Sequence, residues 1–147
     1  MPLDRHPGAQ AAGINWLRLM CLRRPGHDLL DFSAAFNLFL LLAMGHFVGD
    51  FGLQGDKMAC EKCPGCGRTL SWQWWLAAHG GIHAFLVALI TGIPLLGLAE
   101  WILHMAIDVA KCRKLSSMRM DQGLHFACKA LWAFVAVAVA SQPGWLH

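Results

Sequence analysis

Four long apolar segments make up most of the chain, and they constrain its fold more than any other feature. They cover about residues 33–53, 72–91, 94–112 and 123–140. Each approaches the length of roughly 20 residues that an α-helix needs to cross a hydrocarbon core of about 30 Å. Histidines or acids interrupt every segment, so these side chains must face the interior of a bundle rather than lipid. The segments therefore predict an all-α protein, an integral membrane bundle of four transmembrane helices.

The composition supports a lipid environment. Apolar residues make up 56% of the 147 residues and charged residues 14%, against about 25% charged in an ordinary soluble domain. The net charge of +3 is small and is scattered between apolar segments, which excludes a nucleic-acid-binding surface. We expect no removable signal peptide, because a polar lead with arginines precedes the first apolar segment and no cleavage site follows it.

The connections between the segments predict an up-down-up-down topology. The Gly-Ile-Pro sequence at 92–94 is a tight turn that makes the second and third segments antiparallel. We divide the chain into a polar or amphipathic lead at 1–32, a four-helix transmembrane domain at 33–141 and a tail at 142–147. Within the lead, residues 14–24 suit a short interfacial helix in the headgroup layer. The alternative is a soluble lead helix or a disordered tail.

The basic residues of the connections indicate an orientation. Both long polar connections fall on one side of the membrane in this topology, and they carry more lysine and arginine than the opposite side. The positive-inside rule then predicts a multi-pass protein of the bacterial inner membrane with its polar loops in the cytoplasm. The basic residues of the loops are Lys57, Lys62, Arg68, Lys111, Arg113, Lys114 and Arg119, and those of the opposite side are Arg5, Arg18, Arg23 and Arg24.

Four pairs of histidine and aspartate residues, each at i, i+4 spacing, are the candidate functional residues. This spacing places both side chains of a pair on one face of a helix. Every pair lies at a segment end beside a polar connection, so an antiparallel bundle would gather all of them at one depth. The two halves of the chain repeat this plan, which suggests a pseudo-twofold arrangement. The pairs are His46 and Asp50, His79 and His83, His104 and Asp108, and Asp121 and His125.

Imidazoles and carboxylates in this pattern predict a site for one or two divalent metal ions. Zinc is the first choice, manganese or iron also suits these ligands, and the aspartates argue against a soft copper site. A metal ion can make hydroxide available at neutral pH, which indicates a membrane hydrolase of a phosphoester or lipid-type substrate. Asp50, Asp108 and Glu100 are its candidate catalytic carboxylates. The candidate contacts for an anionic group are Lys57, Lys111 and Arg113.

A cluster of three cysteines lies in the first polar connection, at about 59–71. The cluster consists of Cys60, Cys63 and Cys66. Its spacing and turn residues are those of a zinc knuckle, and a fourth ligand from His79 or Cys112 would complete a structural zinc site. Such thiolates indicate a reducing compartment rather than a disulfide framework. The alternative is a loop with unliganded thiols.

Other functions compete with a metal-dependent hydrolase. A haem carrier needs one histidine on each of two facing helices and has no use for the aspartates. A metal, ion or proton conduit needs polar residues at several depths, and in the opposite half only Asn37 and Glu100 approach this requirement. A structural membrane protein would use the charged pairs to hold its helices together.

The ordered set of motifs resembles a known family. The motifs are 45–54 with Lys57, Met58 and Lys62, then 79–83, then 104–108 with Lys111, and finally 121–125. Over about 38–132 they resemble DUF3307, a family of uncharacterised bacterial and phage integral membrane proteins, and the cysteine-bearing segment looks like an addition to its pattern. This resemblance implies a membrane architecture and no established activity. A more distant similarity to inner-membrane metal-dependent hydrolases implies metal-site roles for the same eight histidines and aspartates.

Overall fold

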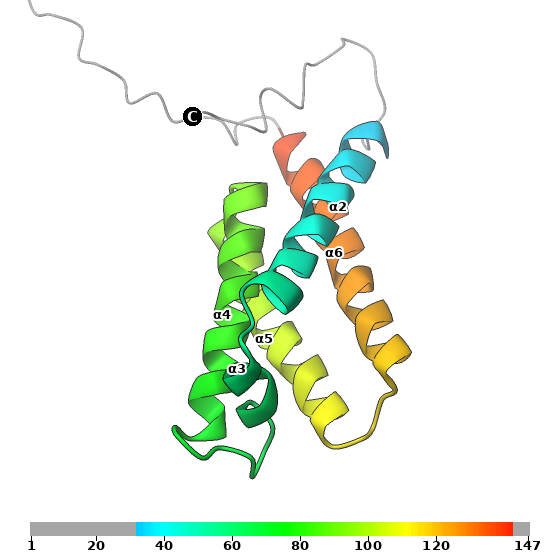
Figure 1. Cartoon of the computed structure of the whole chain (residues 1–147). Helices are drawn as coiled ribbons and strands as arrows, with labels where there is room; N and C mark the ends of the chain where they lie inside the picture. The colour runs from blue at the N-terminus through cyan, green and yellow to red at the C-terminus, as the bar shows by residue number, and fades with distance from the viewer. Residues whose placement is uncertain (1–31, 143–147) are drawn as a thin grey trace, which may run out of the picture.

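The computed structural model describes residues 32–142, and these are almost entirely helical (Figure 1). The four apolar segments form four long helices, and a short helix lies in the first polar connection. The elements are α2 (Phe32–Phe47), the π-helical turn η1 (Val48–Gly52), α3 (Asp56–Glu61), α4 (Trp72–Thr91), α5 (Pro94–Cys112) and α6 (Met118–Ala140). The predicted interfacial helix at 14–24 lies outside the described residues.

The connection between α4 and α5 has the turn chemistry that the sequence predicts. Gly92 ends α4 with a φ of 70°, a left-handed conformation that glycine adopts without strain because it has no Cβ. Pro94 begins α5, where its missing N–H leaves no helical hydrogen bond unmade. The two helices therefore run side by side in opposite directions. They pack closely at Gly97, where a Cβ would lie 2.5 Å from the carbonyl oxygen of Ala84.

Each long helix packs against two neighbours, so the four helices enclose a common interior. α2 contacts α4 and α6, and α5 contacts the same two helices. The end of the interior nearest the α4–α5 turn is an apolar core. Its buried side chains include Leu38, Leu42, Val87, Leu96, Trp132 and Val137. The opposite end, beside α3 and the connection between α5 and α6, is polar.

The buried side chains at the polar end are charged or titratable, whereas the outer faces of the helices are apolar. The largest fully buried side chains include Lys129, Glu100, Asp121 and five histidines. The exposed apolar side chains include Phe36, Phe85, Leu89, Leu95, Ile102 and Leu131. A surface of this kind is costly in water and favourable in hydrocarbon, and polar groups turned inward are the membrane-protein pattern.

Three of the described helical stretches are long and apolar enough to cross a membrane. They are Phe32–Gly52, Trp72–Thr91 and Met118–Ala140. α5 is not one of them, because Glu100, Asp108 and Lys111 all fall within its 19 residues. The prediction of transmembrane helices is thus confirmed for three candidate spans. It is not confirmed for a fourth, nor for the up-down-up-down arrangement across a bilayer.

Candidate metal centre

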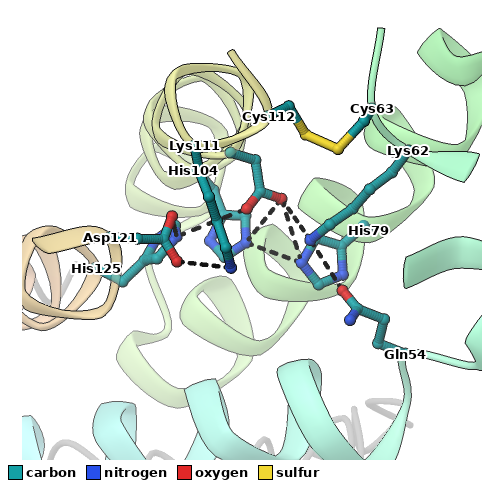
Figure 2. The surroundings of a disulfide bond; sticks show 10 residues. Gln54, Lys62, Cys63, His79, His104, Lys111, Cys112, Asp121 and His125 are labelled. Atoms are coloured by element: carbon teal, nitrogen blue, oxygen red, sulfur yellow. Dashed lines mark hydrogen bonds and ion pairs between the residues drawn. A yellow bond between two sulfur atoms is a disulfide. The ribbon is translucent and has the colours of Figure 1, made fainter. Parts of the chain in front are cut away.

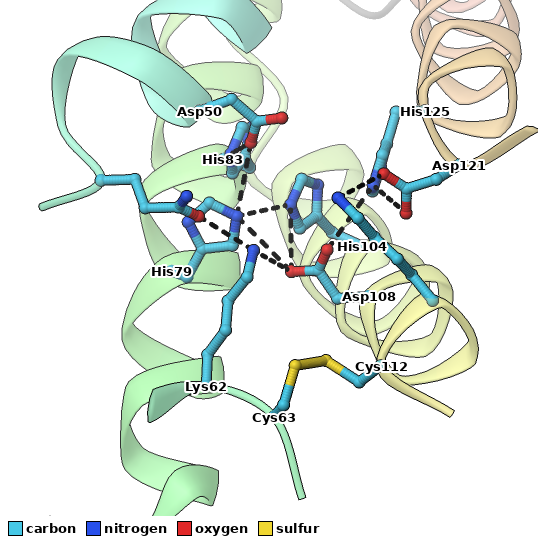
Figure 3. A network of polar contacts seen from close by, with 12 residues as sticks. Asp50, Lys62, Cys63, His79, His83, His104, Asp108, Cys112, Asp121 and His125 are labelled. Carbon is cyan, nitrogen blue, oxygen red and sulfur yellow. Dashed lines mark hydrogen bonds and ion pairs between the residues drawn. A yellow bond between two sulfur atoms is a disulfide. The ribbon is translucent and has the colours of Figure 1, made fainter. Parts of the chain in front are cut away.

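The four predicted His/Asp pairs meet at the polar end of the interior, and Figure 3 shows their residues apart from His46. α2 contributes His46, η1 contributes Asp50, α4 contributes His79 and His83, α5 contributes His104 and Asp108, and α6 contributes Asp121 and His125. The side chains of all except Asp50 are almost completely buried. The convergence predicted from their positions at the segment ends is therefore present in the structure.

Asp50 contacts three histidines from two helices. Its Oδ1 lies 3.1 Å from Nε2 of His83 and 3.4 Å from Nε2 of His79. Its Oδ2 lies 3.5 Å from Nε2 of His46, one turn earlier in the chain. The Asp50 carboxylate thus joins the α2 side of the centre to the α4 side.

The π-helical turn η1 brings Asp50 to His83. The backbone N–H of Leu53 donates to the carbonyl of Val48, five residues earlier, at 2.9 Å. Such widened turns are frequent at functional sites. Gly49, inside the turn, leaves room for the imidazole, because a Cβ at this position would lie 2.4 Å from Cε1 of His83. The close approach of η1 and α4 therefore requires glycine.

Asp108 lies among histidines from two other helices and its own. Its Oδ2 is 3.5 Å from Nε2 of His79 and 3.9 Å from Nε2 of His104. Its Oδ1 is 3.9 Å from Nε2 of His125. Nε2 of His125 in turn lies 3.8 Å from Oδ1 of Asp121. The two oxygens of Asp108 thus face different parts of the centre.

The donor atoms of these residues form three groups that could each hold a metal ion. Within a group each residue offers one ligand atom, and these atoms lie within 4.8 Å of one another. The groups are Asp50, His79, His83 and His104; His46, His104 and His125; and Asp108, Asp121 and His125. Imidazole nitrogen and carboxylate oxygen suit zinc, manganese or iron.

Several buried nitrogen and oxygen atoms of the centre have no hydrogen-bond partner in the described part of the chain. They include Nδ1 of His79 and Oδ1 of Asp121. Most buried polar atoms in proteins are paired, and exceptions often mark a bound water or ion. The unpaired atoms therefore fit a metal ion as the group that the ligands would hold.

Glu100 is an orienting carboxylate behind His104. Its Oε1 lies 3.1 Å from Nδ1 of His104 and accepts from Nζ of Lys129 at 2.5 Å, and its Oε2 accepts from Nε1 of Trp132 at 2.6 Å. A proton on Nδ1 of His104 leaves Nε2 free to face the centre, the arrangement that second carboxylates give to metal-binding histidines. Lys129 was not among the predicted residues, although it follows His125 by four residues and so lies on the same helix face.

Two lysines contact the aspartates of the centre from outside (Figure 2). Nζ of Lys62 donates to Oδ2 of Asp108 at 2.8 Å and to Oε1 of Gln54 at 2.9 Å. Nζ of Lys111 lies 3.0 Å from Oδ2 of Asp121. Lys62 was not among the predicted anion contacts, because its position in a loop gave no sign that its side chain turns inward.

A cavity of about 380 Å³ opens beside these contacts. It is lined by two acids and two lysines of the centre, which are Asp50, Asp108, Lys62 and Lys111. A small anion in this cavity would meet both lysines. Of the other predicted anion contacts, Lys57 lines a separate cavity of about 540 Å³, and Arg113 is exposed.

The cysteine cluster does not form the predicted zinc knuckle. Cys63 is bonded to Cys112 in a disulfide that ties the segment after α3 to the end of α5 (Figure 2). A sulfur in a disulfide is not available as a thiolate ligand, and Cys60 and Cys66 are free and exposed. The structural zinc prediction is therefore wrong. The cysteines therefore no longer indicate a reducing compartment, because that interpretation depended on thiolates rather than a disulfide.

Glu61 fixes the loop that follows α3. Its Oε2 accepts hydrogen bonds from the backbone N–H groups of Thr69 at 2.8 Å and Arg68 at 2.9 Å, and from the indole N–H of Trp75 at 3.2 Å. The backbone N–H groups of Thr69 and Arg68 lower the pKa of Glu61 from 4.5 to about 2, because they stabilise its carboxylate form. The segment that carries Lys62 is thus held against the start of α4.

Comparison with known proteins supports the resemblance found in the motifs. No curated protein and no solved structure matches the chain, so the more distant similarity to metal-dependent hydrolases has no support. The sequence model of DUF3307, described as a protein of unknown function, matches residues 38–146. This range contains all eight histidines and aspartates of the centre. The chain therefore belongs to the DUF3307 family.

Proposed function

We propose that this protein is a membrane protein that binds divalent metal ions at its His/Asp centre. The supporting observation is the grouping of eight nitrogen and oxygen ligands from four helices, with donor atoms within 4.8 Å in each group. Helix-to-helix ion pairs alone do not account for this grouping, because an unpaired buried polar atom costs about 1–3 kcal/mol. A bound metal ion would offset that cost. Zinc is the first candidate, followed by manganese and iron.

In this proposal α5 crosses the membrane together with the three apolar helices, in up-down-up-down order. Of the three charges that set α5 apart, Glu100 and Asp108 are buried, and Lys111, in the last turn, is partly exposed and lies 3.0 Å from Asp121. Its outer face carries Leu95, Leu98 and Ile102, all exposed. Ionisable residues that face the interior of a bundle are compatible with a membrane span.

We place the centre in the cytoplasmic half of a bacterial inner membrane, on the basis of the positive-inside rule. The disulfide favours the opposite, oxidising side, so the orientation needs a direct test. Cys60 is exposed and free, and it can report the orientation in a variant that lacks Cys21 and Cys66. A membrane-impermeant thiol reagent should label Cys60 only after the cells are opened. Labelling of Cys60 in intact cells would instead show that the centre faces the opposite side of the membrane.

Hydrolysis of an anionic ester is the reaction that the cavity favours. A bound metal ion lowers the pKa of its water from about 15.7 towards 7. Asp50 and Asp108 both line the cavity; Asp108 would help to hold the ion, and an oxygen of Asp50 that is not bound to the ion would accept a proton from such a water. The water oxygen would form a bond to phosphorus or to a carbonyl carbon, the ester bond would break, and the alcohol would leave with that proton. Glu100, held by Lys129 and Trp132 away from the cavity, has a positioning role in this scheme.

The haem-carrier hypothesis fits the centre less well. The rings of His83 and His104 stack with centroids 3.8 Å apart, and those of His104 and His125 lie 4.1 Å apart. Imidazoles in direct contact leave no space for a porphyrin between two axial histidines. A purely structural role for the charged pairs is the remaining alternative, and the following experiment separates it from metal binding.

Metal analysis of matched variants tests the proposal. The protein is purified in detergent, incubated with zinc, manganese or iron, freed of excess metal and analysed by mass spectrometry. We expect at least one ion per chain in the wild type and in D56N, an exposed aspartate of α3, and a clear loss in D50N. Helicity of D50N, measured by circular dichroism, separates ligand loss from unfolding. If the wild type retains no more zinc, manganese or iron than the buffer blank after each incubation, the proposal is overturned.

The hydrolase proposal has its own test. Metal-loaded protein should release p-nitrophenol from a p-nitrophenyl phosphate ester, and a chelator should abolish the release. A metal-loaded protein without esterase activity on phosphate or carboxylate esters would remove the hydrolase and leave a metal-binding membrane protein.

A further inference from the structure

We propose that the centre holds two metal ions, bridged by the carboxylate of Asp108, and that these ions displace Lys62 and Lys111 from their aspartates. This inference rests on the proposed metal-binding function and specifies how the ligands divide. It also names the ligand class of the cavity, which is an anion with phosphate-like oxygens.

Two of the three candidate groups share no residue. The first set is Asp50, His79, His83 and His104, and the second is Asp108, Asp121 and His125. The third group, His46, His104 and His125, shares one residue with each of them. The seven ligands of the two sets exceed the four of a tetrahedral ion or the six of an octahedral one. Oδ1 of Asp121 in the second set is buried without a hydrogen-bond partner, whereas Nε2 of His83 in the first set lies 3.1 Å from Oδ1 of Asp50. The second set therefore has its own indication of a missing cation.

Asp108 lies between the two sets (Figure 3). Its Oδ2 faces His79 and His104 of the first set, at 3.5 Å and 3.9 Å from their Nε2 atoms. Its Oδ1 faces His125 of the second set, at 3.9 Å from Nε2. A carboxylate that offers one oxygen to each of two ligand sets has the arrangement of a bridge between paired metal ions.

The two lysines occupy carboxylates that the two ions would need. Lys62 contacts Oδ2 of Asp108, the oxygen that faces the first set, at 2.8 Å, and Lys111 contacts Oδ2 of Asp121 in the second set at 3.0 Å. An ammonium group and a metal ion compete for the same carboxylate, since each satisfies its negative charge. Binding of the first ion would therefore free Lys62, and binding of the second would free Lys111.

The freed lysines would face the cavity, because both of them line it. An anion entering there would meet two ammonium groups and the metal pair. Phosphate-like oxygens suit this combination, because paired metals and basic side chains together neutralise the charge of a phosphoryl group. Inorganic phosphate and a phosphate monoester on a lipid share this chemistry, and their competition with each other would identify the preferred source.

Manganese loading tests the number of ions. Metal-free protein in detergent is titrated with Mn²⁺, and bound manganese is measured together with the electron paramagnetic resonance spectrum. We expect two ions per chain and a spin-coupled spectrum in the wild type and in D56N. D121N should retain one ion with an uncoupled spectrum, and H83Q should lose the ion of the first set.

Two lysine variants test the displacement without depending on a loss of binding. K62M should raise the affinity of the Mn²⁺ ion of the first set roughly tenfold, because no ammonium competes for Oδ2 of Asp108. K57M, which removes an exposed lysine outside this cavity, should leave that affinity unchanged. Inorganic phosphate should bind the manganese-loaded wild type more tightly than the metal-free protein.

The outcomes distinguish this inference from the function on which it rests. One ion per chain in the wild type, or two ions in D121N, would overturn the two-ion division and leave a metal-binding protein. No bound manganese, zinc or iron would overturn both. A K62M protein whose ion in the first set binds no more tightly than in the wild type would overturn the displacement of the lysine.

Discussion

A methyl group added at Gly49 should damage the metal centre although no proposed ligand is replaced. A Cβ there would lie 2.4 Å from Cε1 and 2.7 Å from Nε2 of His83. Ordinary Cβ contacts begin near 3.4 Å, so the imidazole must move by about 1 Å. Metal–ligand distances tolerate only about 0.2 Å. G49A should therefore lower metal affinity at least tenfold, the lower end of the effect of losing a supporting residue.

G52A is the matched control for this substitution. Gly52 lies in the same π-helical turn, and a Cβ there would meet nothing closer than an atom of Val48 at 3.8 Å. Both variants add one methyl group to η1, so their difference isolates the contact with His83. The overpacking in G49A should also cost about 1–3 kcal/mol of stability, which G52A should not lose.

The assay is competition for Zn²⁺ with a chelator, alongside thermal unfolding in the same detergent. If G49A and G52A bind zinc with the same affinity as the wild type, the close approach of η1 to α4 is not part of a metal centre. If both lose affinity equally, the effect belongs to the backbone of the turn and not to His83.

Other predictions concern the fold around the centre. G97A should destabilise the protein by about 1–3 kcal/mol, because its Cβ would lie 2.5 Å from a carbonyl oxygen of α4. G81A, whose Cβ would have no atom nearer than 3.9 Å, should be neutral or stabilising by up to about 1 kcal/mol. Denaturant unfolding measures both free energies. Reduction of the bond between Cys63 and Cys112, 49 residues apart, should lower the free energy of unfolding by up to about 4 kcal/mol, and a reductant should have no effect on the double serine variant. The depressed pKa of Glu61 means that its contribution to stability is complete above pH 4.5 and is lost as the pH falls towards 2; melting temperatures of E61Q should therefore lack this part of the pH dependence.

Local spacing explains why much of the centre could be predicted. His46 and Asp50 are four residues apart, and their side chains do lie 3.5 Å from each other. The turn chemistry of Gly92 placed the end of α4 correctly, because the left-handed conformation is a property of that one residue. Lys129 could have been found by the same reasoning, since it extends the spacing of Asp121 and His125 by one further turn.

Contacts across the fold could not be predicted in this way. Lys62 reaches Asp108 across 46 residues, and a flexible side chain in a loop gives no periodic signal. The cysteine spacing favoured zinc, whereas the disulfide pairs Cys63 with a residue of another helix, Cys112. The π-helical turn depends on a single change of hydrogen-bond partner, and neighbouring glycines alone do not specify it.

The sequence by itself determined that the chain is helical, that its helices are apolar outside, and that histidines and acids occupy inner faces near the helix ends. These properties repeat along the chain with the period of the helix, so they can be predicted from one segment without knowing which other helices pack against it. Only the tertiary structure decided which carboxylate lies between two ligand sets, which lysines neutralise it and which cysteines bond. Those choices depend on helix rotation and on separations of a few ångströms, which arise when whole helices pack together.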